Sequence, residues 1–440
     1  MSYTRDSAAR RLLIITYHFP PDGAVGGQRW EGLSKYLARL GWEIHIVTAA
    51  VAGNYASPPN VHRHVRHRRR TLNDLYRTQK GRVHGGTDPG QSSSSPPQLG
   101  ASPFRLLMGV RRIVSGSMSL PDDARGWVVR AARAARDLAR VADFDVVITS
   151  GPPHSAHLAG VLATIGTGSQ RWIDMRDPWS TRHAMHLPQD GFIRAERFLL
   201  RQLEKLTFRG AAKVIANTRE SAAVLKEESP DLDVVFFPNG IDLEQLPARE
   251  DESVERASIA HVGTLYLNRS PTPIIAAMGA ILRDRGPTTT LKLNLAGPME
   301  PAHRERVNGE ISALGLASSV KVHGVLPREQ ALSLLSRSHL ALVLAQDQPM
   351  CVPAKMYESV GLGVPTLVIA EEKSAAAREA RRIGAMTVDS GDATGLRSLL
   401  EDLLDGRIPT TLRSKTPISY AELATHMDRL LRGGTTRFLD

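Results

Sequence analysis

Short apolar runs alternate with helical segments along almost the whole chain, and this alternation restricts the fold more than any other feature. The runs of the first half are RLLIITY, EIHIVTA, DVVITS, RWIDMR, KVIANT and VVFFPNG. Those of the second half are ASIAHVG, LKLNLAG, VKVHG, LALVLA, TLVIA and AMTVD. Runs of this length and apolar content are typical of parallel strands that are buried on both faces. The sequence therefore predicts an α/β protein with doubly wound parallel sheets.

The chain length indicates how these elements are divided. A chain of 440 residues is too long for one ordinary core and predicts two domains. The stretch FPNGIDLEQLPARED has the Pro, Gly and Asp content of a connection between domains. We expect Rossmann-like domains at residues 1–240 and 241–415, with a helix in 416–440 that packs back on the first domain. Because ligand pockets favour domain interfaces, we expect the two domains to face each other across a cleft.

Composition excludes several classes of protein. The hydrophobic content of 42% and charged content of 23% are typical of soluble globular proteins. No apolar run approaches the roughly 20 residues of a membrane-spanning helix. The run Leu12–Tyr17 is shorter than the apolar core of a signal peptide. A single cysteine, Cys351, excludes a disulfide framework and a cysteine-based zinc site. We therefore expect a cytoplasmic protein.

The net charge of +11 is concentrated between Val61 and Arg112, where 11 Lys or Arg residues accompany only Asp74 and Asp88. The segment includes a Gly/Ser/Pro-rich tract that cannot bury enough apolar surface to order itself, so we expect a partly disordered insertion at about 55–120. Its basic residues would attract anionic lipid headgroups, which predicts peripheral attachment to the inner face of the plasma membrane. A solvated insertion is the alternative interpretation. Aromatic residues are scarce here, which argues against nucleic acid.

The stretch Val352–Ala370 has the pattern of a phosphate site. It follows the apolar run Leu340–Ala345, so its short helix begins at the carboxyl edge of the expected sheet. Helix amino ends at this edge carry free N–H groups and a partial positive charge. Lys355 adds a cation in the first turn, and Glu358 lies one turn further on the same face, where it can accept hydroxyl groups. A nucleoside diphosphate sugar fits this pattern, although an ordinary strand–helix unit with solvated Lys and Glu has it too.

Candidate site residues also follow the strands of the first half. In FPPDGAVGG, Gly26 and Gly27 allow an anion or a sugar to approach the backbone. This loop is neither GxGxxG nor GxxxxGK, which argues against a dinucleotide enzyme and a P-loop ATPase. His154 follows the run DVVITS, where its imidazole can hydrogen-bond a sugar hydroxyl. Asp177, in DMRDPW, can orient an acceptor or act on its hydroxyl. The alternatives are a helix cap for His154 and an internal Arg–Asp pair for Asp177.

Eight motifs occur in the order found in one known family. FPPDGAVGGQRW, ITSGPPHS, DMRDPW, FPNGID, VGTL, LAGP, HGVLP and PAKMYESVGLGVP resemble those of glycosyltransferase family 4. The resemblance covers nearly all of the chain except the insertion, and it implies the GT-B fold of two Rossmann-like domains. It also implies a retaining transfer of a sugar from a nucleoside diphosphate sugar to an acceptor hydroxyl. Envelope polysaccharide, glycolipid and natural-product glycoside synthesis are the implied settings.

The resemblance also implies roles for individual residues. The loop with Gly26 and Gly27 would lie against the donor diphosphate and the acceptor. Gly263 and Arg269 would meet the donor phosphates, although Thr264 stands where the family commonly has another basic residue. Three residues of the following loops could line the base pocket, namely Gly297, Gly324 and Leu326. We expect no cofactor and no metal, because protein cations would neutralise the diphosphate and no DxD-type pair stands at a suitable strand end.

One position departs from the family pattern. Many members carry two glutamates eight residues apart, and the second corresponds to Glu358, but Met350 stands in place of the first. The missing contact with the donor sugar must then come from the loop 346–350 or be absent. Two competing functions remain at this point: a sugar-nucleotide epimerase with the GT-B fold, and a non-catalytic sugar-nucleotide-binding protein. Analysis of the reaction products distinguishes them.

Overall fold

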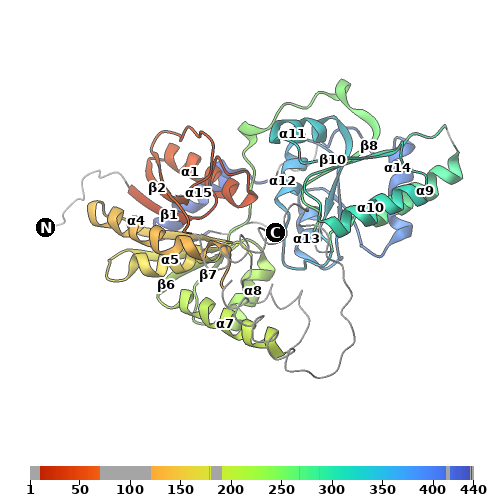
Figure 1. Ribbon diagram of the computed structural model, residues 1–440. Coiled ribbons are helices and arrows are strands. Elements are labelled where there is room, and N and C mark those ends of the chain that lie inside the picture. The colour runs from red at the N-terminus through yellow and green to blue at the C-terminus, as the bar shows by residue number, and fades with distance from the viewer. Residues whose placement is uncertain are drawn as a thin grey trace, which may run out of the picture. The chain divides into compact units, whose positions relative to one another are not determined.

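The computed structural model describes residues 10–69, 120–177, 179, 191–266, 268–286, 288–412, 417–436 and 438. These residues form two compact units (Figure 1). The first comprises Met1–Pro238 with Ala424–Arg437, and the second comprises Asn239–Leu423 with Phe438–Asp440. Each unit has its own parallel sheet with helices on both faces, so the predicted α/β class is confirmed.

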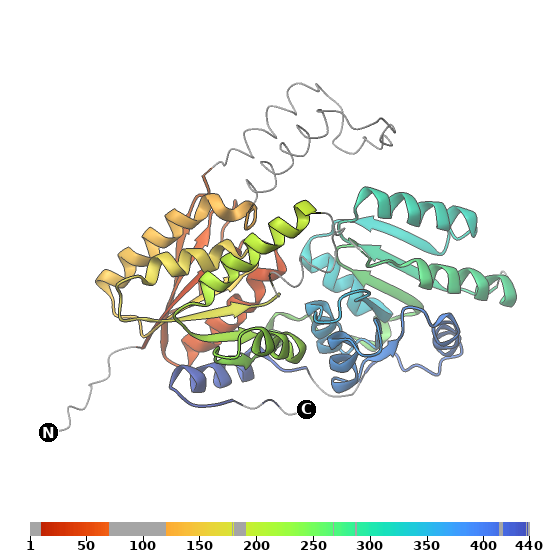
Figure 2. The same ribbon diagram turned by 90° about the horizontal axis from the view of Figure 1, so that it is seen from below.

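The first unit contains a seven-stranded parallel sheet in the order β3-β2-β1-β4-β5-β6-β7. Its strands are β1 Arg10–Thr16, β2 Trp42–Ala49, β3 Val61–Arg66, β4 Val146–Gly151, β5 Gln170–Met175, β6 Ala211–Ala216 and β7 Val234–Phe236. Its helices are α1 Val25–Arg39, η1 Asp123–Trp127, α4 Val128–Val141, α5 Ser155–Thr164, α7 Gly191–Phe208 and α8 Arg219–Glu228. Helix α15, Tyr420–Leu431, begins in the second unit and continues in the first. Helices α4 and α5 cover one face of the sheet, and α1 and α15 cover the other (Figure 2).

Strand β3 corrects one prediction from the sequence. The insertion is predicted to begin near residue 55, but Val61–Arg66 pairs in parallel with β2, from Ile44–Val61 to Ala49–Arg66. An edge strand has a neighbour on one side only and tolerates charged side chains, so the His- and Arg-rich sequence hides this strand. The rest of the predicted insertion, from residue 70 to 119, lies outside the described residues.

The second unit contains a six-stranded parallel sheet in the order β10-β9-β8-β11-β12-β13. Its strands are β8 Glu255–Val262, β9 Lys292–Ala296, β10 Val320–Gly324, β11 Ser338–Leu344, β12 Thr366–Ile369 and β13 Met386–Val388. Its helices are η2 Leu243–Gln245, η3 Asp251–Ser253, α9 Thr272–Arg285, α10 Pro301–Ala313, α11 Arg328–Arg337, α12 Ala354–Gly361, α13 Ala375–Arg382 and α14 Ala393–Leu404. The order of the strands reverses between β8 and β11, and such switch points are where α/β sheets bind ligands.

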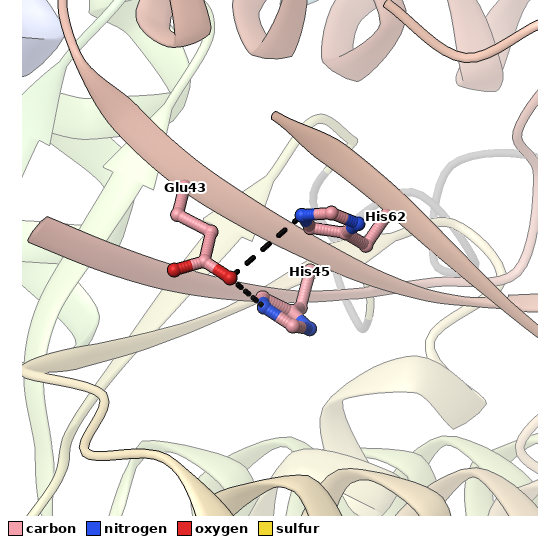
Figure 3. Close-up of side chains that lie close together, drawn as sticks. All are labelled: Glu43, His45 and His62. Carbon is pink, nitrogen blue, oxygen red and sulfur yellow. Dashed lines mark hydrogen bonds and ion pairs between the residues drawn. The ribbon is translucent and has the colours of Figure 1, made fainter. Parts of the chain in front are cut away.

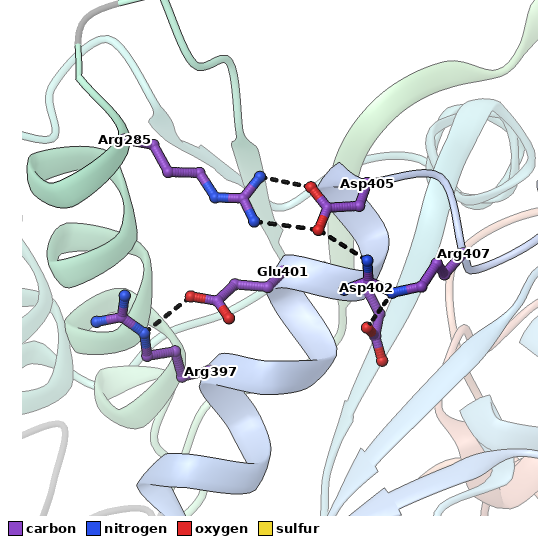
Figure 4. A network of polar contacts seen from close by, with 6 residues as sticks. All are labelled: Arg285, Arg397, Glu401, Asp402, Asp405 and Arg407. Carbon is purple, nitrogen blue, oxygen red and sulfur yellow. Dashed lines mark hydrogen bonds and ion pairs between the residues drawn. The ribbon is translucent and has the colours of Figure 1, made fainter.

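An exposed network of ion pairs joins α9 to α14 and the turn that follows it (Figure 4). Arg285 donates two hydrogen bonds to Asp405, at 2.6 and 3.2 Å, and Arg407 pairs with the same carboxylate. Arg397 of α14 pairs with Asp284 of α9 at 2.8 Å. Because these groups are solvated, salt weakens their attraction, and the buried apolar residues under the two helices supply most of the stability.

None of the helices that the structure describes is both long enough and apolar enough to cross a membrane.

Candidate functional site

Three glycines mark the carboxyl edge of the second sheet. Gly263 follows β8, Gly297 follows β9 and Gly324 ends β10, with φ angles of 148°, 130° and 72°. The N–H of Gly263 donates to the carbonyl of Ala296, and that of Gly297 donates to the carbonyl of Gly324, both at 2.7 Å. A Cβ on Gly297 would lie 2.3 Å from the carbonyl oxygen of Gly263. The three loops therefore lie side by side, and a side chain at Gly297 would separate two of them.

Lys355 reaches these glycines from the first turn of α12. A Cβ built on Gly263 would lie 1.3 Å from the Lys355 Nζ, so the ammonium group occupies the space that a side chain would take there. The pKa of Lys355 is lowered to about 7, mainly by burial and also by the positive charge of Arg269, while Glu358 opposes the shift. Two basic side chains thus meet at the β8–β11 switch point, where an anion would stabilise the charged form of both.

Arg269 lies in the loop between β8 and α9 and is buried. Its Nη2 donates to Gln348 Oε1 at 2.5 Å, and its guanidinium lies 4.8 Å from the centre of the Tyr266 ring. Its Nε has no hydrogen-bond partner among the described residues. Arg269 is therefore held in place by two neighbours while one donor is left for a ligand.

The loop 346–350 carries two buried amides that the sequence pattern does not single out. Gln346 donates from Nε2 to the carbonyl of Ser270 at 2.8 Å, and Gln348 accepts from Arg269. Within the described part of the chain, Gln346 Oε1 and Gln348 Nε2 lack partners. Met350 itself is buried. Buried polar atoms are usually paired, so these two amides are candidates for the sugar contact that a glutamate at 350 would make.

Glu358 is oriented by an ion pair that the sequence does not indicate. Its Oε1 lies 2.8 Å from Nη1 of Arg328, the first residue of α11. Leu326 is half-buried in the loop just before Arg328. The structure thus brings Gly263, Lys355 and Arg269 together, and it places Glu358 one turn along α12 from this group.

In the first unit, the glycine-rich loop lies at the β1–β4 switch point. Asp22 shapes the loop, since its carboxylate lies 2.5 Å from His18 Nδ1 and accepts the N–H of Ala24 at 3.0 Å. A Cβ on Gly26 would lie 2.7 Å from both terminal nitrogens of Arg176, and one on Gly27 would lie 3.2 Å from the Cα of Phe19. The guanidinium of Arg176, which follows β5, therefore lies against Gly26, a contact that the sequence does not indicate.

His154 stands at the amino end of α5, at the same switch point. Its ring stacks on that of Trp179, with centroids 4.8 Å apart and an interplanar angle of 9°. The start of the helix is held by Asp122, whose carboxylate accepts the N–H of Ser155 at 2.9 Å and its hydroxyl at 2.6 Å. His157, by contrast, is fully buried and lies 2.9 Å from the Thr149 hydroxyl, and burial lowers its pKa to about 3. Its role is structural.

Asp177 lies half-buried in the loop after β5. Asp174, in the same stretch, makes an internal Arg–Asp pair, since its carboxylate lies 3.2 Å from Arg29. Asp174 also accepts from Trp30 Nε1 and from the Ser150 hydroxyl, both at 2.8 Å. This buried network joins α1, β4 and β5 and so fixes the strand end from which Asp177 extends.

Two doubly wound parallel units, each with polar loops at its switch point, make up the two-domain GT-B fold. Residues 26–240 match the family model of a glycosyl transferase 4-like domain. Over these residues the match agrees with the resemblance to glycosyltransferase family 4 that the motifs carry.

Solved structures of distant proteins share the whole fold. Sucrose-phosphate synthase (tll1590) from Thermosynechococcus elongatus has a TM-score of 0.65 at 14% identity, covering 96% of this chain and 98% of that one. Anabaena Alr3699/HepE in complex with UDP and glucose has a TM-score of 0.61 at 13% identity, covering 97% and 100%. The lipopolysaccharide outer core galactosyltransferase WaaB, in its apo form, has a TM-score of 0.53 at 10% identity, covering 96% and 99%. No curated protein sequence matches the chain. At these identities the likeness shows the fold.

Proposed function

We propose that the protein transfers a sugar from a nucleoside diphosphate sugar to an acceptor hydroxyl with retention of anomeric configuration. The observation that carries this proposal is the meeting of Lys355 and Arg269 beside Gly263. Because these two basic side chains are largely shielded from water, they favour a negatively charged ligand, and a diphosphate supplies that charge. The Anabaena HepE structure is of a complex with UDP and glucose, and this supports a uridine diphosphate sugar as the first donor to test.

The residues of the second unit would then stabilise the leaving group. As the bond from the sugar to the diphosphate breaks, negative charge grows on the diphosphate and positive charge grows on the sugar ring. Lys355 and Arg269 would bind that negative charge, and removal of one such donor from a preorganised site typically costs about 2.7–4 kcal/mol. Glu358 would accept the ribose hydroxyls, and Gln346 and Gln348 would contact the donor sugar. We assign the neutralisation of charge to these protein cations and to no metal or cofactor.

The residues of the first unit would receive the acceptor. His154, fixed by Trp179, would hydrogen-bond a sugar hydroxyl, and Asp177 would orient the acceptor hydroxyl or take its proton. Gly26 and Gly27 would let the acceptor or the diphosphate approach the backbone. We further propose an acceptor in envelope polysaccharide, glycolipid or natural-product synthesis, and a cytoplasmic enzyme whose basic segment binds anionic membrane.

A panel of nucleotide sugars tests the proposal. The nucleotide sugar that binds should raise the unfolding temperature of the wild-type protein, and Lys355→Met should abolish that rise. Lys373→Met, which removes an exposed lysine in the turn before α13, is the matched control and should keep it. NMR spectra of the products with the protecting donor should show transfer with the donor's anomeric configuration. An epimerised sugar nucleotide, an inverted product, or binding without turnover would each overturn the proposal.

A further inference from the structure

Four polar side chains of β2 and β3 lie on one face of the first sheet, away from the candidate site. Glu43 and His45 are two residues apart on β2, and His62 and His64 are two residues apart on β3. His45 pairs with His62 in the register of the two strands. Because side chains alternate along a strand and paired residues point the same way, all four share a face. Glu43 and His62 are the second residues of their strands, whereas the candidate site follows the carboxyl ends.

Three of these side chains converge on one point (Figure 3). Glu43 Oε1 lies 3.2 Å from His45 Nε2 and 3.7 Å from His62 Nε2. One ligand atom from each residue lies within 4.8 Å of the other two. In a tetrahedral zinc site with bonds of about 2.0–2.1 Å, neighbouring ligand atoms are about 3.3 Å apart. Small side-chain movements therefore suffice to bring the three atoms onto a common metal ion.

The neighbours of the cluster are arranged as the outer partners of metal ligands commonly are. Arg11 Nε donates to the other carboxylate oxygen, Glu43 Oε2, at 2.8 Å and leaves Oε1 toward the imidazoles. His64 Nε2 lies 3.0 Å from His45 Nδ1, so a proton on Nδ1 would leave the Nε2 lone pair of His45 for a metal.

We propose that Glu43 Oε1, His45 Nε2 and His62 Nε2 bind a zinc ion, with water as the fourth ligand. Imidazole nitrogens with one carboxylate suit this borderline metal better than Mg²⁺ or Ca²⁺, which prefer oxygen ligands. The ion would fasten the edge strand β3 to β2. It would therefore act on the fold of the first unit, and it is independent of the proposed transfer reaction.

Zinc titration of the metal-free full chain, by competition with a chromophoric chelator, tests the site. The wild type should bind one Zn²⁺ per chain, and His62→Ala and Glu43→Gln should each lose that binding. His64→Ala should weaken it about 10- to 100-fold through the outer hydrogen bond. His67→Ala is the matched control, because His67 is exposed just beyond β3 and outside the cluster, and it should bind as the wild type does.

Cobalt provides a second readout that does not depend on activity. Co²⁺ in the wild type should give the intense visible absorption of a tetrahedral site, and His62→Ala should lose it. The His62 side chain is 49% exposed, so its removal should leave the fold intact, which circular dichroism can check. Unchanged zinc affinity in both ligand variants, equal loss in His67→Ala, or an octahedral Co²⁺ spectrum would overturn the proposal.

Discussion

The protonation state of Lys355 should change when a ligand binds. Its ammonium group lies against Gly263, with Arg269 as a neighbouring charge, and its pKa is lowered to about 7, mainly by burial. Above pH 7 the free protein therefore holds Lys355 largely uncharged. A diphosphate beside it would raise the pKa again, because an opposite charge favours the protonated form.

We therefore predict that UDP binding at pH 8 takes up a proton and that affinity falls as the pH rises above about 7. Calorimetry in buffers of different ionisation enthalpy measures the uptake, since the observed enthalpy should increase with the ionisation enthalpy of the buffer. Lys355→Met should remove the uptake, and Lys373→Met should retain it. Binding with no proton exchange would show that the diphosphate does not lie beside Lys355.

Glu358 provides a second prediction for a single residue. Glu358→Ala should weaken UDP binding by about 1.5–3 kcal/mol, because a hydrogen bond from ribose to a charged acceptor is lost. Glu329→Ala, which removes an exposed glutamate next to Arg328, should leave the affinity unchanged. Arg328→Ala should have a smaller effect than Glu358→Ala, since it removes only the group that orients the carboxylate. Equal UDP affinities in the wild type and Glu358→Ala would exclude Glu358 from the site.

At the scale of elements, the close packing of the strand ends depends on glycine. Gly297 has a φ of 130°, and a Cβ there would meet the backbone of Gly263. Gly297→Ala should lower the free energy of unfolding by about 1–3 kcal/mol through backbone strain. Gly309→Ala is the control, because Gly309 is an exposed residue within α10 with open space around it, and it should raise stability by about 0.5–1 kcal/mol. Urea denaturation of both variants measures the difference, and equal stabilities would contradict it.

The sequence predicts the central strands of each sheet well, but it predicts the edge strand β3 poorly. Strands such as β1 and β11 are apolar on both faces, so their composition alone identifies them. Strand β3 carries His and Arg because it has one neighbour, and no apolar pattern marks it.

In the candidate site, too, the sequence predicts some residues and not their contacts in space. Lys355 can be placed from its position after a strand, whereas the Arg328–Glu358 pair depends on two helices being neighbours in space.

The buried side chains of loops are a second feature that the sequence pattern does not reveal. Gln346 and Gln348 follow β11 and lie within the stretch expected to replace the missing glutamate, but nothing in their spacing shows that both are buried. The convergence of Glu43, His45 and His62 depends on the register of β2 with β3, which a tertiary contact sets. Sequence patterns report local periodicity, and these features arise from residues that meet only after folding.

At the scale of the whole molecule, membrane attachment through the basic segment is best tested by a deletion that leaves β3 intact. Removing residues 70–112 takes out seven Lys or Arg residues and two Asp while keeping the strand. We predict that this variant, with a neutral Gly/Ser linker of equal length, floats less with anionic phosphatidylserine vesicles than the wild type does. Neither protein should float with neutral vesicles, and high salt should release the wild type. Equal flotation of both proteins would dismiss membrane attachment through this segment.

The first unit is not a continuous piece of chain. It takes in Ala424–Arg437, and Asp428 of α15 accepts a hydrogen bond of 2.8 Å from Trp42 at the start of β2. Domains generally fold as the ribosome releases them, the amino-terminal one first. Here the unit whose synthesis starts first must wait until the other unit has been made before its final helix can dock. The first unit therefore completes its fold only after residues 239–423 of the second unit have been translated, although its own synthesis starts first.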